Sequence, residues 1–262
     1  MTTTRSSAGA AEQALLPEVL ANRRWVRRDV PFPHVVAENV FTPAFYGELH
    51  AEFERIQREH PEAFQRSMAG YDAAGAEVAA HRDGPLGIFV SREWHDLLAG
   101  VAGVRATADV AASLHHHEPG SASGWPHNDL NPGWFGDPAA DAGQIVVTGA
   151  SGVGYHHGNR PPGVEARETV RAVSLLFFLA NPPWQPGDGG ETGLFASVDA
   201  AGRGQRVTVA PVNNSLVLFE CTPLSWHCFL ANATPRNSVV MWLHRRRDEV
   251  VRRWGEHSIV HW

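Results

Sequence analysis

Three residues in two short motifs could hold a metal ion. His127 and Asp129 lie two positions apart in GWPHND, so an extended segment would project both side chains from one face. His227 follows 100 residues after His127 in LSWHCF, directly after the apolar run NSLVLFE. Two imidazoles and one carboxylate form the facial triad that suits non-haem Fe(II) and leaves three coordination positions open. A zinc hydrolase would use the same residues with one open position, and this alternative stays open.

A guanidinium close to these residues could bind a carboxylate. Arg236 lies nine residues after His227 in TPRNSVVMW, on an expected strand beside the one that leads to His227. All 22 basic residues are Arg, and the planar guanidinium presents paired donors that match a carboxylate. The absence of Lys also excludes a lysine Schiff base and a P-loop lysine.

The elements that must position these residues divide the chain into two parts. Residues 43–60 carry apolar side chains at helical steps of four, four and three, and Ser91 can cap a second helix that ends at 100–103. After about residue 110, short β-rich runs alternate with clusters of Gly, Pro, Asn and Asp, which is typical of a jelly roll. The runs are residues 108–117, 143–149, 169–181, 205–211, 214–220 and 236–244.

Residues 173–179 carry apolar side chains on both faces of an expected strand, which predicts that it packs between a second sheet and a helix. The predicted fold is mainly β with flanking helices: a double-stranded β-helix (jelly roll, cupin-like) with a helical N-terminal part. We expect one domain over residues 1–262. Its expected parts are a mostly helical segment at 1–108, a jelly-roll core at 109–245 with an insertion at about 130–170, and a C-terminal tail at 246–262.

The composition limits the classes of partner. With 43% hydrophobic and 19% charged residues, the chain should fold as a globular protein. Its net charge of −6 argues against nucleic acid or an anionic membrane surface as a partner. There is no apolar run typical of a signal peptide or a membrane span, and the two Cys are expected to be free thiols, so we expect a cytoplasmic protein. The sequence does not predict an oligomeric state.

The motifs resemble, in their order, those of the Fe(II)- and 2-oxoglutarate-dependent dioxygenases, and within that superfamily the prolyl-hydroxylase-like branch. PGSASGWPHND is similar to the Gly-rich turn and His-x-Asp motif of that branch. RAVSLLFFLAN and PWQPGDGGETGLF are similar to its strand and GGET-type turn. NNSLVLFECTPLSWHCF, followed by Arg236, Ser238 and Trp242, resembles its distal His, its 2-oxoglutarate-binding Arg and the Trp that follows. The matches span roughly residues 110–245.

The resemblance implies a ligand set and a reaction. It implies that His127, Asp129 and His227 bind Fe(II) and that Arg236 pairs with the far carboxylate of 2-oxoglutarate. Dioxygen and 2-oxoglutarate would be consumed, succinate and CO2 released, and an unactivated C–H bond of the substrate hydroxylated.

One hydrogen bond of the family pattern must come from another residue. A Tyr often supports the 2-oxoglutarate carboxylate from the strand that is matched here by Phe177 and Phe178. We expect this hydrogen bond to come from Ser238 or from the run at 115–117, in which His117 is the candidate cosubstrate contact.

The substrate is expected to be a small metabolite or a free amino acid, because the chain shows no peptide-binding module. Trp134, His156 and His157 are candidate substrate contacts, and the insertion that surrounds them could form a lid or a wall. A protein prolyl hydroxylase and a non-catalytic jelly-roll binding protein remain alternatives.

A halogenase of the same superfamily is a further alternative. His156 and Gly158 in GYHHGNR form a His-x-Gly motif, in which loss of the carboxylate leaves room for chloride. This motif lies nearer in sequence to Arg171 than His127 does, so a site at His156 would need a shorter insertion. However, a site at His156 would leave the GWPHND motif without a role.

Overall fold

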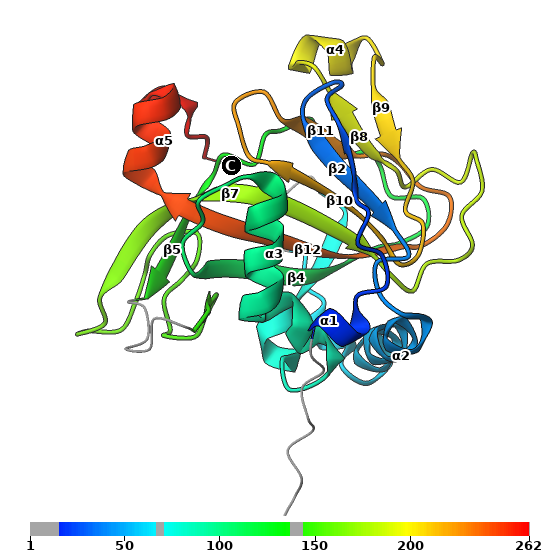
Figure 1. Ribbon diagram of the computed structural model, residues 1–262, viewed down its shortest axis with the longest axis horizontal. Coiled ribbons are helices and arrows are strands. Elements are labelled where there is room, and N and C mark those ends of the chain that lie inside the picture. The colour runs from blue at the N-terminus through cyan, green and yellow to red at the C-terminus, as the bar shows by residue number, and fades with distance from the viewer. Residues whose placement is uncertain (1–15, 67–70, 137–143, 262) are drawn as a thin grey trace, which may run out of the picture.

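Two facing sheets form the centre of the structure, a computed structural model that describes residues 16–66, 71–136 and 144–261. The large sheet contains, in order, β1 (Val26–Arg28), β2 (His34–Glu38), β10 (Ser215–Glu220), β7 (Ala166–Phe178), β12 (Arg236–Arg246), β4 (Asp109–His117) and β3 (Ala73–Glu77). Two short strands join it: β5 (Pro132–Gly136) beside β7 and β6 (Val146–Val147) beside β4. The small sheet contains β11 (Trp226–Phe229), β8 (Thr192–Phe195) and β9 (Val207–Val209). The arrangement is the predicted double-stranded β-helix (Figure 1).

Strand β7 is buried on both faces, as its sequence predicts. Phe177 packs on the helical side, with its ring centroid 5.3 Å from those of Phe41 and Phe89. Phe178, its neighbour, packs with Leu194 of the small sheet. Successive residues of one strand therefore belong to two different cores, because successive strand side chains point to opposite faces.

Two helices cover the outer face of the large sheet, α2 (Pro43–Glu59) and α3 (Arg92–Ala102), and both lie where the sequence predicts them (Figure 1). Ser91 caps α3 by accepting a hydrogen bond from the N–H of Trp94 at 3.2 Å, and Gly103 ends it in the left-handed conformation. The buried face of α2 consists of Phe45, Leu49, Phe53 and Ile56. The remaining helices are α1 (Leu16–Val19), α4 (Val198–Gly202), α5 (Arg247–Trp254) and short 3-10 turns at Pro61–Ala63, Val78–His81, Pro85–Val90 and Glu256–Ser258.

The N-terminal part also supplies strands, which the sequence analysis did not predict. β2 pairs with β10, and β3 pairs with β4 at the other end of the large sheet. Two segments of the N-terminal part thus add strands to the large sheet, most of which the C-terminal half forms. α2 and α3 cover the outer face of this sheet. The assignment of residues 1–262 to one domain, with the parts expected from the sequence, stays a prediction.

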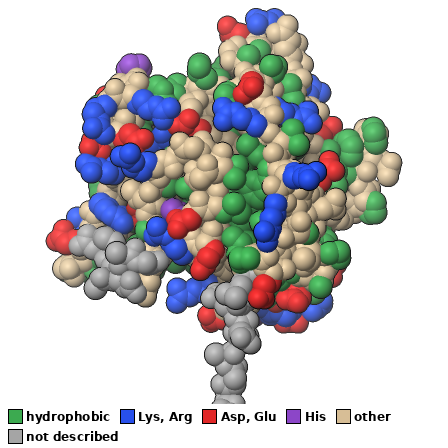
Figure 2. All heavy atoms as spheres, viewed as in Figure 1, with side chains coloured by type: hydrophobic (Ala, Val, Ile, Leu, Met, Phe, Trp, Pro, Cys, Tyr) green, Lys and Arg blue, Asp and Glu red, His purple; other side chains and the backbone are tan. Residues whose placement is uncertain are grey.

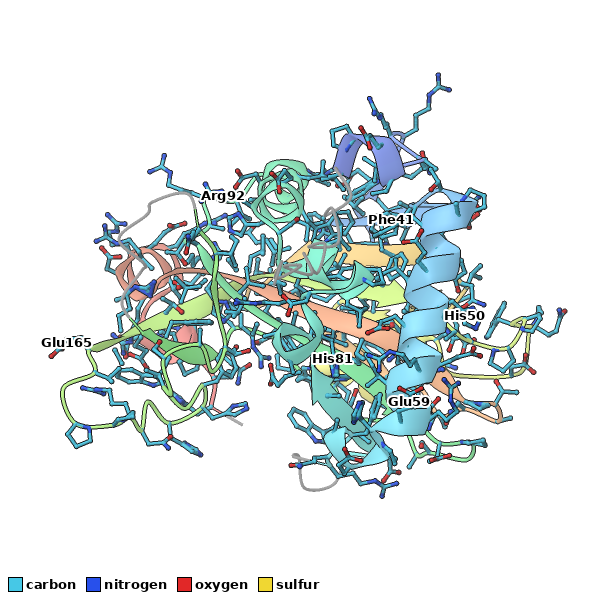
Figure 3. All side chains as sticks on the ribbon, turned by 90° about the horizontal axis from the view of Figure 1, so that it is seen from below. Phe41, His50, Glu59, His81, Arg92 and Glu165 are labelled. Carbon is cyan, nitrogen blue, oxygen red and sulfur yellow. The ribbon has the colours of Figure 1, made fainter. Side chains whose placement is uncertain are left out.

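The expected insertion at about 130–170 lies beside the jelly roll. It contains β5, β6 and a loop that leads into β7 and includes Glu165, at the opposite end of the molecule from α2 (Figure 3). On the face seen in Figure 2, acidic and basic side chains lie interspersed. In the described part of the chain, the helices are too short or too polar to cross a membrane.

Removal of the α3 cap tests the account of the helical layer. Ser91→Ala should lower the free energy of unfolding by about 1 kcal/mol, because the N–H of Trp94 loses its acceptor. Urea denaturation measures the change, and metal binding should be unaffected. A stability equal to that of the wild type would show that the cap contributes nothing.

Candidate active site

His127 and His227 are held together by backbone hydrogen bonds. The N–H of His127 donates to the carbonyl of His227 at 3.0 Å, and the N–H of His227 donates back at 2.8 Å. This isolated bridge places a loop segment beside β11, although the two residues are far apart in the sequence. The two imidazole rings lie with their centroids 4.4 Å apart.

Asp129 completes a cluster of three potential metal ligands. One ligand atom from each of His127, Asp129 and His227 lies within 4.8 Å of the other two. The Nε2 atom of His227 is 3.4 Å from Oδ2 of Asp129, and Nε2 of His127 is 4.0 Å from Oδ1. Two imidazoles and one carboxylate on neighbouring backbone segments are the donor set of a facial triad.

Backbone carbonyls orient both imidazoles. Nδ1 of His127 lies 2.9 Å from the carbonyl oxygen of Trp125, and Nδ1 of His227 lies 2.9 Å from that of Ser225. A carbonyl only accepts, so each Nδ1 donates and each Nε2 keeps its lone pair, directed toward Asp129. Burial lowers the pKa of His127 to about 4, which keeps this imidazole neutral and able to bind a cation at neutral pH.

Three donors surround the carboxylate of Asp129. Nη1 of Arg171 donates to Oδ1 at 2.7 Å, and the Ser174 hydroxyl and the Trp242 indole N–H donate to Oδ2. Burial alone would raise the pKa of Asp129, but the positive charge of Arg171 holds it well below its usual range. The acid therefore stays ionised although only 2% of its surface is exposed.

The insertion positions Arg171. Its Nε donates to the hydroxyl oxygen of Tyr155 at 3.0 Å, and its guanidinium lies 3.8 Å from the ring centroid of Trp242. Tyr155 also lies 2.9 Å from Nε2 of His244 on β12. A Cβ atom on Gly133 would lie 2.4 Å from the Tyr155 ring, so the glycine in β5 makes the room that this ring occupies.

Arg236 is a buried cation without an acidic partner in the described part of the chain. Its guanidinium donates to the hydroxyl groups of Ser238 at 3.1 Å and Thr192 at 3.3 Å, and its Nε has no partner. Burial lowers the pKa of Arg236 to about 10, so the group is still charged at neutral pH. A buried charge that is not neutralised is costly, and an anionic ligand would remove this cost.

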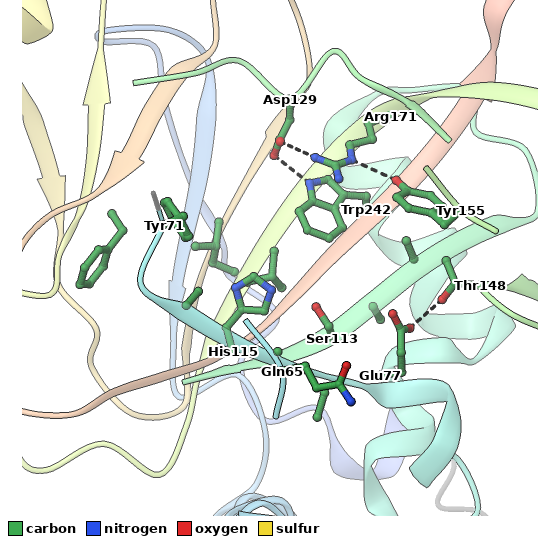
Figure 4. Close-up of a pocket in the computed structure, with 18 of the residues that line it drawn as sticks. Gln65, Tyr71, Glu77, Ser113, His115, Asp129, Thr148, Tyr155, Arg171 and Trp242 are labelled. Carbon is green, nitrogen blue, oxygen red and sulfur yellow. Dashed lines mark hydrogen bonds and ion pairs between the residues drawn. The ribbon is translucent and has the colours of Figure 1, made fainter. Parts of the chain in front are cut away.

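One cavity of about 480 Å³ is lined by Arg236 and by the three clustered residues. Figure 4 shows Asp129 in this cavity, together with Tyr71 and Tyr155. β3 and β4 line one side of it, and the insertion lines another through Thr148, Tyr155 and His156. The volume falls within the range of small-molecule sites. The donor set fits Fe(II), and Arg236 fits a carboxylate in the same cavity.

The predicted cosubstrate contacts differ in their positions. Arg236 lines the cavity. Ser238 does not line it, but its hydroxyl accepts a hydrogen bond from the Arg236 guanidinium. His117 does not line the cavity, because its ring is fully buried and stacked on Phe229 at 3.8 Å. His115, two residues earlier on the same face of β4, lines the cavity instead.

The predicted substrate contacts are also divided. His156 lines the cavity, whereas His157 and Trp134 do not. A Cβ atom on Gly158 would lie 2.5 Å from the Trp134 ring, so these two residues pack against each other. Since His127 and Asp129 are the residues that face His227, the geometry removes the support for a halogenase site at His156-x-Gly158.

No sequence motif indicated the positions of Tyr71, Tyr155 and Thr192 or the role of Arg171. Tyr71 lies in the cavity opposite the side that Tyr155 occupies (Figure 4), and its pKa is raised to about 12 by burial. A Cβ atom on Gly124 would lie 2.2 Å from the Tyr71 ring. The Gly-rich turn before His127 therefore indicated that a bulky side chain packs against Gly124, but it did not indicate which residue supplies that side chain.

Part of the chain matches a known protein family. Residues 143–244 match the sequence profile of the 2OG-Fe(II) oxygenase superfamily. The matched segment contains His227 and Arg236 and begins after His127 and Asp129. Over this segment, which is less than half of the chain, the sequence is similar to that superfamily, and the donor set of His127, Asp129 and His227 fits the Fe(II) that the name of the superfamily states.

Solved structures share the fold. A prolyl-4-hydroxylase from Pseudomonas putida is 17% identical with a TM-score of 0.54, over 81% of this chain and 92% of that chain. A prolyl hydroxylase from Trichoplax adhaerens, solved with a hypoxia-inducible-factor peptide fragment, is 14% identical with a TM-score of 0.56, over 84% and 86%. The α-ketoglutarate-dependent carbocyclase SnoK from nogalamycin biosynthesis is 14% identical with a TM-score of 0.52, over 80% and 79%. A comparison with curated proteins finds no match.

The buried pair of Asp129 and Arg171 should show strong energetic coupling. In metal-free protein, Asp129→Ala should lower the free energy of unfolding by about 3 kcal/mol, because it leaves a buried guanidinium without its anion. The double variant Asp129→Ala/Arg171→Met should lose less than the sum of the single losses. Urea denaturation with a chelator present measures the cycle, and strictly additive losses would contradict a direct interaction.

Proposed function

We propose that His127, Asp129 and His227 bind Fe(II) and that Arg236 binds the distal carboxylate of 2-oxoglutarate. The observation that supports this most directly is the unpaired, buried Arg236 in the same cavity as the His-Asp-His cluster. Ser238 and Thr192 hold the guanidinium in place through its two terminal nitrogens. Tyr71 lies in the same cavity and takes the place of the missing tyrosine on β7.

The reaction we propose is hydroxylation of an unactivated C–H bond of a small molecule. When bound, iron and 2-oxoglutarate supply oxidative decarboxylation to succinate and CO2, with one oxygen atom of dioxygen entering the substrate. The chain's own residues orient the ligands: the backbone carbonyls fix both imidazoles, and three donors fix the carboxylate of Asp129. The walls of the cavity exclude water from the reacting groups.

The shape of the cavity supports a small substrate. The segment that begins at β3 bounds one side and the loop with Tyr155 and His156 bounds another, so the insertion acts as a wall. The cavity must also accommodate 2-oxoglutarate, which leaves room for a compact molecule. A protein prolyl hydroxylase is the alternative, and its peptide would have to enter between these two walls.

A metal titration tests the proposed ligand set. Anaerobic addition of Fe(II) and 2-oxoglutarate should produce a weak charge-transfer band in the visible, and His227→Ala should abolish it because one imidazole ligand is lost. His157→Ala is the matched control, since His157 does not line the cavity. A band that survives in His227→Ala would refute the assignment.

A cosubstrate titration tests Arg236 separately. Arg236→Gln should raise the Kd of 2-oxoglutarate at least about tenfold, because a charge-assisted pair to the carboxylate is lost. The Kd of Fe(II), measured without 2-oxoglutarate, should stay unchanged, and Arg24→Gln at an exposed position serves as the control. An unchanged Kd for 2-oxoglutarate would mean that its carboxylate binds elsewhere.

A further inference from the structure

The charges around the cavity are unevenly compensated. Asp129 and Arg171 form an ion pair, and the proposed function assigns Arg236 to 2-oxoglutarate. Burial lowers the pKa of the other lining imidazoles, so they are neutral at pH 7; these are His81, His115 and His156. Among the lining residues that the structure describes, the remaining charged group is Glu77.

Glu77 is placed to contact a ligand. It is the last residue of β3 and lies at the exposed mouth of the cavity, apart from Asp129 (Figure 4). Its Oε2 accepts a hydrogen bond from the Thr148 hydroxyl at 2.8 Å, and no cation in the described part of the chain pairs with it. Partial burial raises the pKa of Glu77 although its hydrogen bond from Thr148 opposes this, and a cation beside the carboxylate would favour the ionised form.

Glu77 shares its face of β3 with small residues. Alternation along β3 places Ala73, Gly75 and Glu77 on one face. The pairing register puts Gly75 opposite His115 and Glu77 opposite Ser113 on β4, and Ser113 and His115 both line the cavity. A Cβ atom on Gly75 would lie in ordinary van der Waals contact with the His115 ring, at 3.7 Å, so the glycine leaves the space of one side chain beside this imidazole.

Apolar and aromatic groups form the rest of the walls near the cluster. Trp242, Val240 and Leu176 line the cavity together with Ala111. Such walls favour an apolar body, while a carboxylate at the mouth favours a positive group at one end.

We propose that the substrate is a compact, largely apolar molecule with a protonated amine, which Glu77 and Thr148 bind at the mouth of the cavity. Its body lies on the small residues of β3 and β4 and reaches toward the His-Asp-His cluster. This inference rests on the proposed function and names the substrate class for the same site.

Matched probes test the preference for an amine. Tryptamine is compared with tryptophol and indole-3-acetate, which present a neutral hydroxyl and an anion on the same ring system. Calorimetry on protein loaded anaerobically with Fe(II) and 2-oxoglutarate should show tryptamine binding about fivefold more tightly than tryptophol, and indole-3-acetate binding most weakly. Glu77→Gln should remove the preference, whereas Glu48→Gln, at an exposed position of α2, should retain it.

The outcomes separate this inference from the proposed function. Equal affinities for tryptamine and tryptophol, including no measurable binding of either, overturn the inference, as does a preference that persists in Glu77→Gln. The charge-transfer band is recorded in the same samples. If the band forms but tryptamine is not preferred, the proposed function stands and the inference is refuted. If no band forms in the wild-type protein, the proposed function is refuted, and calorimetry on the same protein still measures the amine preference.

Discussion

The buried carboxylate of Asp129 is the constraint on which the rest of the site depends. An ionised acid with almost no exposed surface is strongly disfavoured unless charges and donors compensate it. Here the compensation comes from Arg171 and Ser174 on β7 and from Trp242 on β12. The two central strands of the large sheet thus fix the position of a loop residue, and Tyr155 of the insertion fixes Arg171 in turn. The insertion therefore supports the cluster of His127, Asp129 and His227 and also forms a wall of the cavity.

The cavity contains two buried guanidinium groups whose surroundings differ. Arg171 pairs with a carboxylate of the chain, whereas Arg236 donates to two hydroxyl groups and its Nε is unsatisfied among the described residues. The first is balanced by the fold itself, so a further anion gains little beside it. The second is left for an anion from outside, and this difference in pairing makes Arg236 the site of the cosubstrate carboxylate in our proposal.

The sequence predicted those features that depend on local pattern. Helical spacing located α2 and the Ser91 cap located α3, and the apolar run of β7 predicted its two buried faces. The order of short motifs was sufficient to select His127, Asp129 and His227, which the structure brings together.

Features that depend on contacts between distant segments could not be predicted in this way. Alternation along β4 put His115 and His117 on the same face, but the stacking of Phe229 decides which of the two is covered. Tyr71 reaches the cavity from a segment with no motif of its own, and the pairing of Arg171 with Asp129 depends on β7 passing beside the loop. A glycine such as Gly124 indicates that space is needed, but the residue that fills it is found only in the fold.

The distribution of charge along the cavity gives it a direction. Arg236 marks a positive region, Glu77 marks a negative region, and the charge of Asp129 is offset by Arg171. A dianionic cosubstrate is attracted to the first region and repelled from the second, so it should not compete for the space of the substrate. An amine-bearing substrate is subject to the opposite forces. Both ligands must occupy one continuous cavity at the same time. This distribution of charge would therefore direct the cosubstrate toward Arg236 and the amine toward Glu77 before either ligand contacts the His-Asp-His cluster.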